Sequence, residues 1–370
     1  MPIARKHLVD EALPSCFHCI SRCVRRAYLC GDAAEHRRDW VRDRIRAAAA
    51  SFAVDVLAYA VMNNHLHIVV STEPSRVTAW TAREVAERWA VAHPRTGADG
   101  APVPWSDPAI AAKANDGAWV AKARLRLRSL SWFMKSIKEG LARRANRDDG
   151  CTGHFWEGRF RSVPLLDQAA VIACMAYVDL NPIRAASADR PENSHFTSVQ
   201  DRIIAREAYQ RDRVVRAASM PPTPVQPAAS EATLVPSLYA EAEARGADIS
   251  ETEAEAGPES GLWIAPIAAA TISLGNTAVI SLDDYLTLVD ETGRCVRGGK
   301  RGAIPQRLAP ILERLNLDLA AWMELMHHAG SFHGSAFGSV AARAREAVRR
   351  GARWIVDVTC GLYGTTPTAA

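Results

Sequence analysis

Two runs rich in β-branched and aliphatic residues constrain the fold more than any other feature of the sequence. Val54 to Val61 and His65 to Val70 are separated by only three residues, Met62-Asn63-Asn64. A connection this short joins antiparallel neighbours, because a parallel crossover needs a dozen or more residues. The pair therefore predicts a β-hairpin within an antiparallel sheet.

The segments around this hairpin supply the other expected elements. Phe17 to Arg22 has the composition of a short strand, and Asp39 to Ala50 has the apolar spacing of an amphipathic helix. Helical spacing returns over Lys122 to Ala145 and over Asp167 to Leu180, where Pro182 ends the second helix. The order strand, helix, strand, strand, helix predicts an α+β protein in which helices cover one face of the sheet.

Composition divides the chain of 370 residues into three parts. Prolines and acidic residues dominate 218–260, which predicts a linker because such a segment cannot bury enough apolar surface to fold alone. We expect residues 1–217 to form one domain, with an inserted segment at about 75–118 where prolines interrupt short helical stretches. Residues 261–370 are expected to form a small, mainly helical C-terminal region.

The charge is distributed unevenly. The first 220 residues carry 33 Lys and Arg against 24 Asp and Glu, whereas the remainder carries 12 against 17. The basic front indicates a polyanionic partner. The uncharged stretch from Ser260 to Leu282 contains proline and glycine and has acidic flanks, which argues against a membrane span. The absence of a signal-peptide pattern and the dilute cysteines favour a cytoplasmic protein.

The motif Asn64-His65-Leu66-His67 could bind a metal. Side chains alternate along a strand, so His65 and His67 project to one side. Two imidazoles on one strand face suit a divalent cation. The alternative is a pair of surface histidines on a half-buried strand.

A second motif, Tyr177-Val178-Asp179-Leu180-Asn181-Pro182, places Tyr177 and Asn181 four residues apart on one helix face. The phenol could act as a nucleophile, and the amide oxygen could be a hard ligand for the same metal. The alternative is a tyrosine packed in the core and an asparagine that ends the helix before a proline.

A third motif is basic. Lys122 to Arg147 contains nine Lys and Arg and one acid, Glu139, and is followed by His154 to Arg161, where aromatics alternate with arginines. Phosphate neutralisation together with base stacking would use this mixture. A solvated helix face followed by an ordinary strand is the alternative, but helix faces usually mix charges of both signs, so nucleic acid is favoured.

The cysteines near the N-terminus allow a zinc hypothesis. Cys16 and Cys19 form a CxxC pair, with Cys23 and Cys30 beyond. No second CxxC follows, and the run also fits a strand with small apolar thiols. A zinc-dependent hydrolase using His65, His67 and a cysteine would follow from the first interpretation.

In this order, the motifs resemble those of the single-tyrosine HUH transposases, an insertion-sequence transposase family, and among them the REP-associated tyrosine transposases. The resemblance covers about residues 14–200. It is carried by Phe17-His18-Cys19-Ile20-Ser21-Arg22, Tyr59-Ala60-Val61-Met62-Asn63-Asn64-His65-Leu66-His67, Phe133-Met134-Lys135-Ser136-Ile137-Lys138, Gly153-His154-Phe155-Trp156-Glu157-Gly158-Arg159-Phe160-Arg161 and Tyr177-Val178-Asp179-Leu180-Asn181-Pro182-Ile183-Arg184-Ala185.

The resemblance implies a ferredoxin-like antiparallel sheet with helices on one face. It also implies that Tyr177 is the nucleophile and that His65, His67 and Asn181 bind Mg²⁺ or Mn²⁺. In this chain Leu66 stands between the two histidines. The long segment at about 75–118 and the region after the linker lie outside the family pattern.

The implied activity is cleavage and rejoining of single-stranded or hairpin DNA, derived from a repeat, through a 5′-phosphotyrosine. A domesticated DNA-binding protein, regulatory or repeat-processing, is the alternative, and both monomer and homodimer remain open. Basic side chains would hold the DNA backbone and two aromatic rings would stack on bases: Arg22, Lys135, Lys138, Arg159 and Arg161 for the first role, Phe155 or Trp156 for the second.

Overall fold

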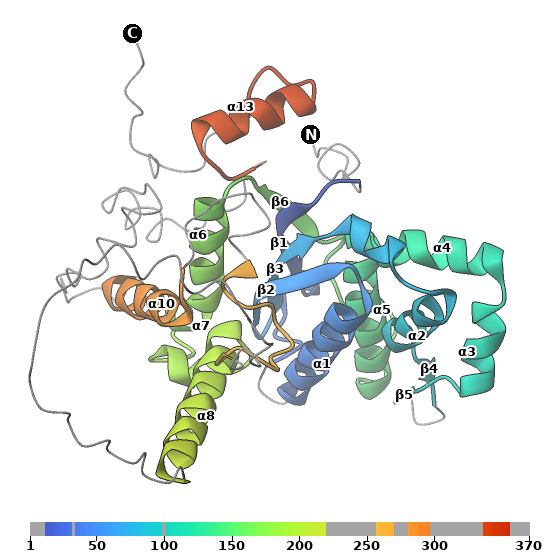
Figure 1. Ribbon diagram of the computed structural model, residues 1–370, viewed down its shortest axis with the longest axis horizontal. Helices are drawn as coiled ribbons and strands as arrows, with labels where there is room; N and C mark the ends of the chain where they lie inside the picture. Colours follow the sequence, from blue (N-terminus) through green and yellow to red (C-terminus); the bar gives the residue numbers. More distant parts are fainter. Residues whose placement is uncertain are drawn as a thin grey trace, which may run out of the picture.

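A four-stranded antiparallel sheet forms the centre of the protein (Figure 1). Its strands are β1 (Ser15–Arg22), β2 (Val54–Val61), β3 (His65–Thr72) and β6 (Arg161–Leu165), in the order β2-β3-β1-β6. The computed structural model describes residues 12–31, 34–97, 101–219, 257–269, 280–296 and 336–355. The order of strands and crossover helices is that of a ferredoxin-like βαββαβ unit. The predicted α+β class and the hairpin are confirmed.

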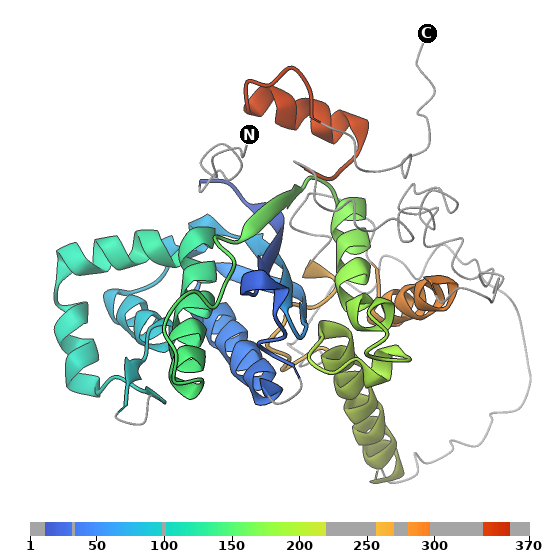
Figure 2. The same ribbon diagram turned by 180° about the vertical axis from the view of Figure 1, so that it is seen from behind.

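Helices cover both faces of this sheet (Figures 1 and 2). The crossover helices α1 (His36–Ser51) and α5 (Leu130–Asp148) pack on one face, as expected. The other face is covered by α6 (Gln168–Asp179), which the prediction of helices on one face did not include. Every residue of α6 is buried, because the helix is apolar on all sides and is enclosed between the sheet and later segments.

The segment at about 75–118, which the sequence predicts to be an insertion, forms a lobe beside α1 and α5. It contains η4 (Pro74–Thr78), α2 (Ala82–Ala92), β4 (Arg95–Thr96), β5 (Pro102–Val103), α3 (Asp107–Ala114) and the start of α4 (Gly117–Leu127). The helix expected over Lys122 to Ala145 is divided between α4 and α5. The break lies at Ser129, whose backbone is extended and which stands at the N-cap of α5.

The remaining elements are η2 (Val24–Arg26), α7 (Asn181–Arg184), η5 (Pro191–Asn193), α8 (Ser198–Ser219), α10 (Leu282–Val296) and α13 (Val340–Arg349).

Segments beyond the predicted linker pack against the elements that precede it. The fully buried Arg202 of α8 donates hydrogen bonds to the carbonyl oxygens of Leu57 and Ala265 and to the carboxylate of Glu259. This side chain therefore holds residues 257–269 along the β2 edge of the sheet.

Both ends of α6 are held by C-terminal segments. At its start, Asp167 accepts hydrogen bonds from the backbone N–H of Ala170 at 2.9 Å and of Ser339 at 2.7 Å. At its end, the buried Asp179 accepts a hydrogen bond from the Tyr285 hydroxyl of α10 at 2.6 Å. A side chain at Gly293 would approach Leu180 to 2.9 Å, so α10 lies close against the end of α6.

The predicted linker is only partly described. Residues 220–256 lie outside the described part of the chain, whereas 257–260 already pack against α8 through Glu259. The stretch from Ser260 to Leu282 was considered above as a membrane span. Among the described residues, no helix combines the length and apolar character needed to cross a bilayer.

Candidate active site

Three histidines and one tyrosine meet between the sheet and α6. His67 lies at the centre of this histidine–tyrosine cluster, with its ring centroid 5.0 Å from that of His18, 4.8 Å from that of His65 and 5.8 Å from that of Tyr177. The rings of His18 and Tyr177 are 6.0 Å apart. The structure thus brings together three residues from β1 and β3 with the predicted nucleophile from α6.

The strand register explains why these side chains share a face. His67 is paired with Ile20 of β1, and Ile20 is paired in turn with Arg161 of β6. His65 is paired with Arg22. Directly opposed residues of an antiparallel sheet project to the same side, so two arginines lie on the same sheet face as the histidines. Both were predicted to contact DNA.

Hydrogen bonds fix the imidazoles. His65 Nδ1 lies 2.6 Å from Asn64 Oδ1, and since an amide oxygen only accepts, this nitrogen carries the proton. The remaining nitrogen of a neutral His65 then has the lone pair that a metal requires. His18 Nε2 and His67 Nδ1 are 2.8 Å apart, within hydrogen-bond distance. Burial lowers the pKa of His65 from 6.5 to about 4, and the positive charge of Arg22 contributes in the same direction.

Tyr177 is buried, with 7% of the residue exposed. Burial raises the pKa of its hydroxyl, while the nearby guanidinium groups of Arg184 and Arg22 act in the opposite direction. The Arg184 guanidinium lies over the tyrosine ring, 5.0 Å from its centroid. The phenol is therefore neutral near pH 7, and cations next to it would stabilise negative charge as it develops.

Asn181 stands one turn beyond Tyr177, at the start of α7. Its Nδ2 donates a hydrogen bond to the carbonyl oxygen of Tyr177 at 3.1 Å. Since the nitrogen is used in this way, the amide oxygen is the atom suited to a cation. The neighbouring Asp179 points away from the cluster and accepts hydrogen bonds from Ser198, Val199 and Tyr285.

The donor set that the sequence predicts is chemically mixed, because an amide oxygen suits a hard divalent cation whereas imidazole nitrogens suit a softer one. It comprises the imidazoles of His65 and His67 and the amide of Asn181, carried by β3 and α7. In the described part of the chain, no group of three or more His, Cys, Asp or Glu side chains is arranged to hold a metal. His18 therefore does not complete a three-histidine centre, and the predicted metal set of two histidines and Asn181 stays a prediction.

The zinc hypothesis for the cysteines finds no support in the structure. Cys16 and Cys19 lie three residues apart on β1 and pack in the separate cores on opposite faces of the sheet. They cannot chelate one ion from there. Cys23 and Cys30 are also buried, in the second core.

The predicted DNA-binding side chains lie in three places. Arg22 and Arg161 are near the histidine–tyrosine cluster, as described above, and Arg159 is exposed just before β6. Lys138 donates a hydrogen bond to the carbonyl oxygen of Gly158 at 2.7 Å, and Lys135 lies on the exposed side of α5.

The two aromatic residues predicted to stack on bases are core residues. Phe155 is 2% exposed and Trp156 8% exposed, and Trp156 Nε1 donates to the carbonyl oxygen of Lys138 at 3.0 Å. The surface that these rings offer to a base is small. Partly exposed aromatic rings occur instead on α1, α2 and α5 and in the segment between β5 and α3, namely Trp40, Trp89, Trp132 and Trp105.

Sequence reasoning missed His18 and Arg184 as parts of the site. His18 lies on the strand that was predicted, and its even spacing from Ile20 and Arg22 indicates the shared face once the pairing of β1 with β3 is known. Arg184 follows Tyr177 by seven residues, two helical turns, so it returns to the same side. The spacing of both residues can be read from the sequence, but for His18 it indicates the site only when the register of β1 against β3 is known.

The shifted histidine predicts a pH-dependent stability. Because the folded pKa of His65 is about 4 and the unfolded value about 6.5, the unfolded chain binds a proton first as the pH falls. The free energy of unfolding should therefore decrease between pH 6.5 and 4, by up to about 1.4 kcal/mol per pH unit for this proton. Urea unfolding at several pH values measures this dependence. The free energy of unfolding should change less with pH in His65→Gln than in wild type, whereas the exposed His154→Gln should behave as wild type. Equal pH dependence of His65→Gln and wild type would contradict the prediction.

No protein-family model matches the chain, and no curated protein matches it. A solved structure of a REP-associated tyrosine transposase bound to a REP hairpin is similar over 55% of this chain and 86% of that chain, with 12% sequence identity and a TM-score of 0.33.

Proposed function

We propose that the chain is a transposase-like enzyme that cleaves single-stranded or hairpin DNA and rejoins it through a 5′-phosphotyrosine on Tyr177, using Mg²⁺ or Mn²⁺. The observation that carries the proposal is the histidine–tyrosine cluster on a basic sheet face. One tyrosine ring lies within 6.0 Å of two histidine rings, and Arg22 and Arg161 project from the same side. Nucleophile, imidazoles and phosphate-binding cations are the groups that phosphoryl transfer to a phenol requires.

Cleavage exchanges one phosphate ester for another. The Tyr177 oxygen forms a bond to phosphorus and loses its proton, while the bond from phosphorus to the 3′-oxygen breaks and that oxygen gains a proton. The products are a 5′-phosphotyrosine and a strand with a free 3′-hydroxyl. Attack by another 3′-hydroxyl reverses the exchange, so rejoining needs no ATP.

The side chains around the ring would have separate tasks. Arg184 holds the tyrosine ring from one side and favours the ionised phenol. Arg22 and Arg161 would bind phosphate oxygens of the incoming strand. His65, His67 and Asn181 would hold the divalent cation, which when bound withdraws charge from the phosphate.

A denaturing gel with end-labelled hairpin DNA tests the proposal. We expect a slowly migrating covalent adduct with Mn²⁺ and none with EDTA. His65→Ala should reduce the adduct by at least about 100-fold. Loss of a group that only hydrogen-bonds a metal ligand already costs about 10–100-fold in activity or metal affinity, and loss of the ligand itself should cost more. DNA affinity in a gel-shift assay should remain largely unchanged, because the arginines are retained.

The exposed His154→Ala provides the matched control and should form adduct at the wild-type rate. Equal adduct formation in EDTA would contradict the metal requirement. Binding without an adduct over a broad panel of hairpins would replace the proposal with a DNA-binding protein that has lost transposition.

A further inference from the structure

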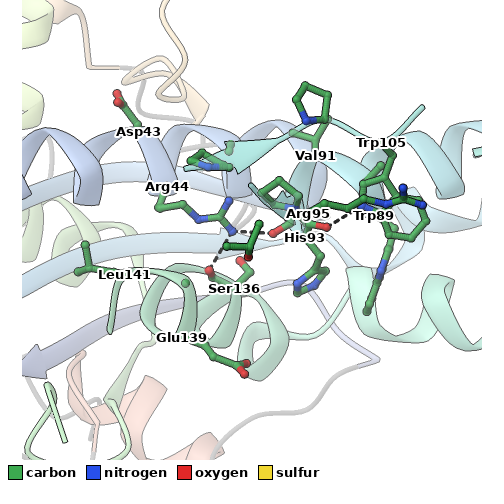
Figure 3. Close-up of a pocket in the computed structure, with 18 of the residues that line it drawn as sticks. Asp43, Arg44, Trp89, Val91, His93, Arg95, Trp105, Ser136, Glu139 and Leu141 are labelled. Carbon is green, nitrogen blue, oxygen red and sulfur yellow. Dashed lines mark hydrogen bonds between the residues drawn. The ribbon is translucent and has the colours of Figure 1, made fainter. Parts of the chain in front are cut away.

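A pocket of about 830 Å³ lies among α1, α2, α5 and the β4–β5 segment (Figure 3). This volume is within the range of small-molecule sites. The crossover helices that line the pocket pack on the sheet face opposite to α6. The pocket is therefore separate from the histidine–tyrosine cluster, and the chemistry proposed for Tyr177 does not use it.

Aromatic rings form much of its wall, and we call it the tryptophan pocket after Trp40, Trp89, Trp105 and Trp132, which line it together with His93. The ring centroid of Trp89 lies 4.2 Å from that of His93 and 5.8 Å from that of Trp132. Trp105 Nε1 donates a hydrogen bond to the carbonyl oxygen of His93 at 2.9 Å, which holds the Trp105 ring beside the same residues. The walls offer several flat rings at half-buried positions.

Cations lie over these rings. The guanidinium of Arg144 is 3.7 Å from the centroid of Trp40, and the ammonium of Lys135 is 4.5 Å from the centroid of Trp132. Among the lining acids, Glu139 is already paired with Arg143 and Lys135. The rim thus combines positive charge with stacking surfaces, the combination that single-stranded nucleic acid requires.

Two residues that line the pocket each contain a buried nitrogen atom without a hydrogen-bond partner within the described part of the chain, Arg44 Nε and His93 Nε2. Arg44 already donates through its Nη2 to the carbonyl oxygens of Ala92 and Ser136, at 2.6 and 2.9 Å (Figure 3). Burial lowers the pKa of His93 to about 4, so its ring is neutral and one of its nitrogens can accept. Buried polar atoms are usually satisfied, so a bound planar group with polar edges would complete both.

We propose that the tryptophan pocket binds unpaired bases of single-stranded DNA. The bases would stack on the tryptophan rings, their polar edges would meet Arg44 and His93, and the flanking phosphates would lie along the cations of α5. This inference rests on the proposed function only in taking DNA as the polyanion. Binding at this pocket does not need Tyr177, so the two can fail separately.

Gly140 allows a test that removes neither an aromatic ring nor a cation. It lies in the middle of α5 and lines the pocket, and a Cβ placed there would have Arg44 Nε as its nearest neighbour, at 3.8 Å. Gly140→Phe adds a benzyl group at the pocket wall, which narrows the space between the tryptophan rings. Gly140→Ala is the matched control, which adds only one methyl group and removes a glycine that costs an exposed helix about 0.5–1 kcal/mol.

The measurement is the affinity of the full-length protein for a short oligothymidine and for an abasic oligonucleotide of equal length and charge. Tryptophan fluorescence monitors the binding. We expect wild type and Gly140→Ala to bind the oligothymidine at least about tenfold more tightly than the abasic strand, the effect of one stacked base. Gly140→Phe should lose this preference, with its adduct formation on hairpin DNA retained.

Equal affinity of wild type for the two strands would overturn the inference, because binding would then be purely electrostatic. So would an unchanged preference in a folded Gly140→Phe. If that variant does not fold, photocrosslinking of a 5-iodouracil oligonucleotide to wild type decides the question. Crosslinks to Trp89, Trp105 or Trp132 support the pocket, and crosslinks confined to other residues exclude it.

Discussion

We expect Tyr177→Phe to yield no covalent protein–DNA adduct at any metal concentration, whereas the wild type should form one. The substitution removes only the hydroxyl, so the ring still packs against His18 and His67 and beneath Arg184. We expect the free energy of unfolding to change by no more than about 1 kcal/mol, the net value of one hydrogen bond. Denaturing gels and urea unfolding of the same preparation measure both quantities.

Tyr209→Phe is the matched control for this experiment. Tyr209 also lies on a helix with an arginine over its ring, Arg213 at 5.8 Å from the centroid, but α8 carries it away from the sheet face. Its adduct formation should equal that of wild type. A surviving adduct in Tyr177→Phe would assign the nucleophile to another residue and remove the central element of the proposed function.

Asp179→Ala should lower the free energy of unfolding by about 3–5 kcal/mol, the range observed when one partner of a buried charged network is removed. The carboxylate is fully buried and accepts hydrogen bonds from the Ser198 hydroxyl, the Val199 N–H and the Tyr285 hydroxyl. Alanine leaves the Val199 N–H and the Tyr285 hydroxyl buried without this acceptor, at about 1–3 kcal/mol each, whereas the Ser198 hydroxyl can still donate to the carbonyl oxygen of Tyr59, at 3.5 Å. Urea unfolding measures the loss.

Asp179→Asn serves as the graded comparison, because the amide retains one oxygen acceptor and should lose only part of the stability. The exposed Asp189→Ala should change the free energy of unfolding by less than about 0.5 kcal/mol. A loss below about 1 kcal/mol for Asp179→Ala would mean that the contacts between α6, α8 and α10 contribute little to the folded state.

The sequence predicted the local elements of the sheet well. The second strand was expected over Val54 to Val61 and occupies those residues, and α6 begins and ends within one residue of the expected helix. Both follow from short-range signals, namely the hairpin connection and the capping residue Asp167. The helix over Lys122 to Ala145 was predicted as one element because its apolar spacing continues across the break at Ser129.

The face on which α6 packs could not be read from its own residues. Its apolar character is the same on all sides, so no stripe indicates a direction. Its surroundings are set instead by Tyr285, which lies 106 residues after its partner Asp179, and by Ser339, which lies 172 residues after its partner Asp167. The predicted linker separates the two members of each pair. Pairings over such separations leave no periodic trace in the sequence.

The site was predictable in part, for the same reason. His65 and His67 share a strand and Tyr177 and Asn181 share a helical turn, so local geometry predicts each pair. His18 and Arg22 join them only through the pairing of β1 with β3. The aromatic surface was assigned to Phe155 and Trp156 from their alternation with arginines, but the strand and loop that follow α5 turn both rings inward.

The contacts at both ends of α6 also bear on protein synthesis. When the ribosome has made α6, the hydroxyl of Tyr285 that Asp179 binds lies 106 residues further along the chain. At about 5–20 residues per second, that residue follows after roughly 5–20 s. The contacts around the helix that carries Tyr177 are therefore completed late, and a nascent chain still attached to the ribosome would hold this side chain loosely until the C-terminal segments have emerged.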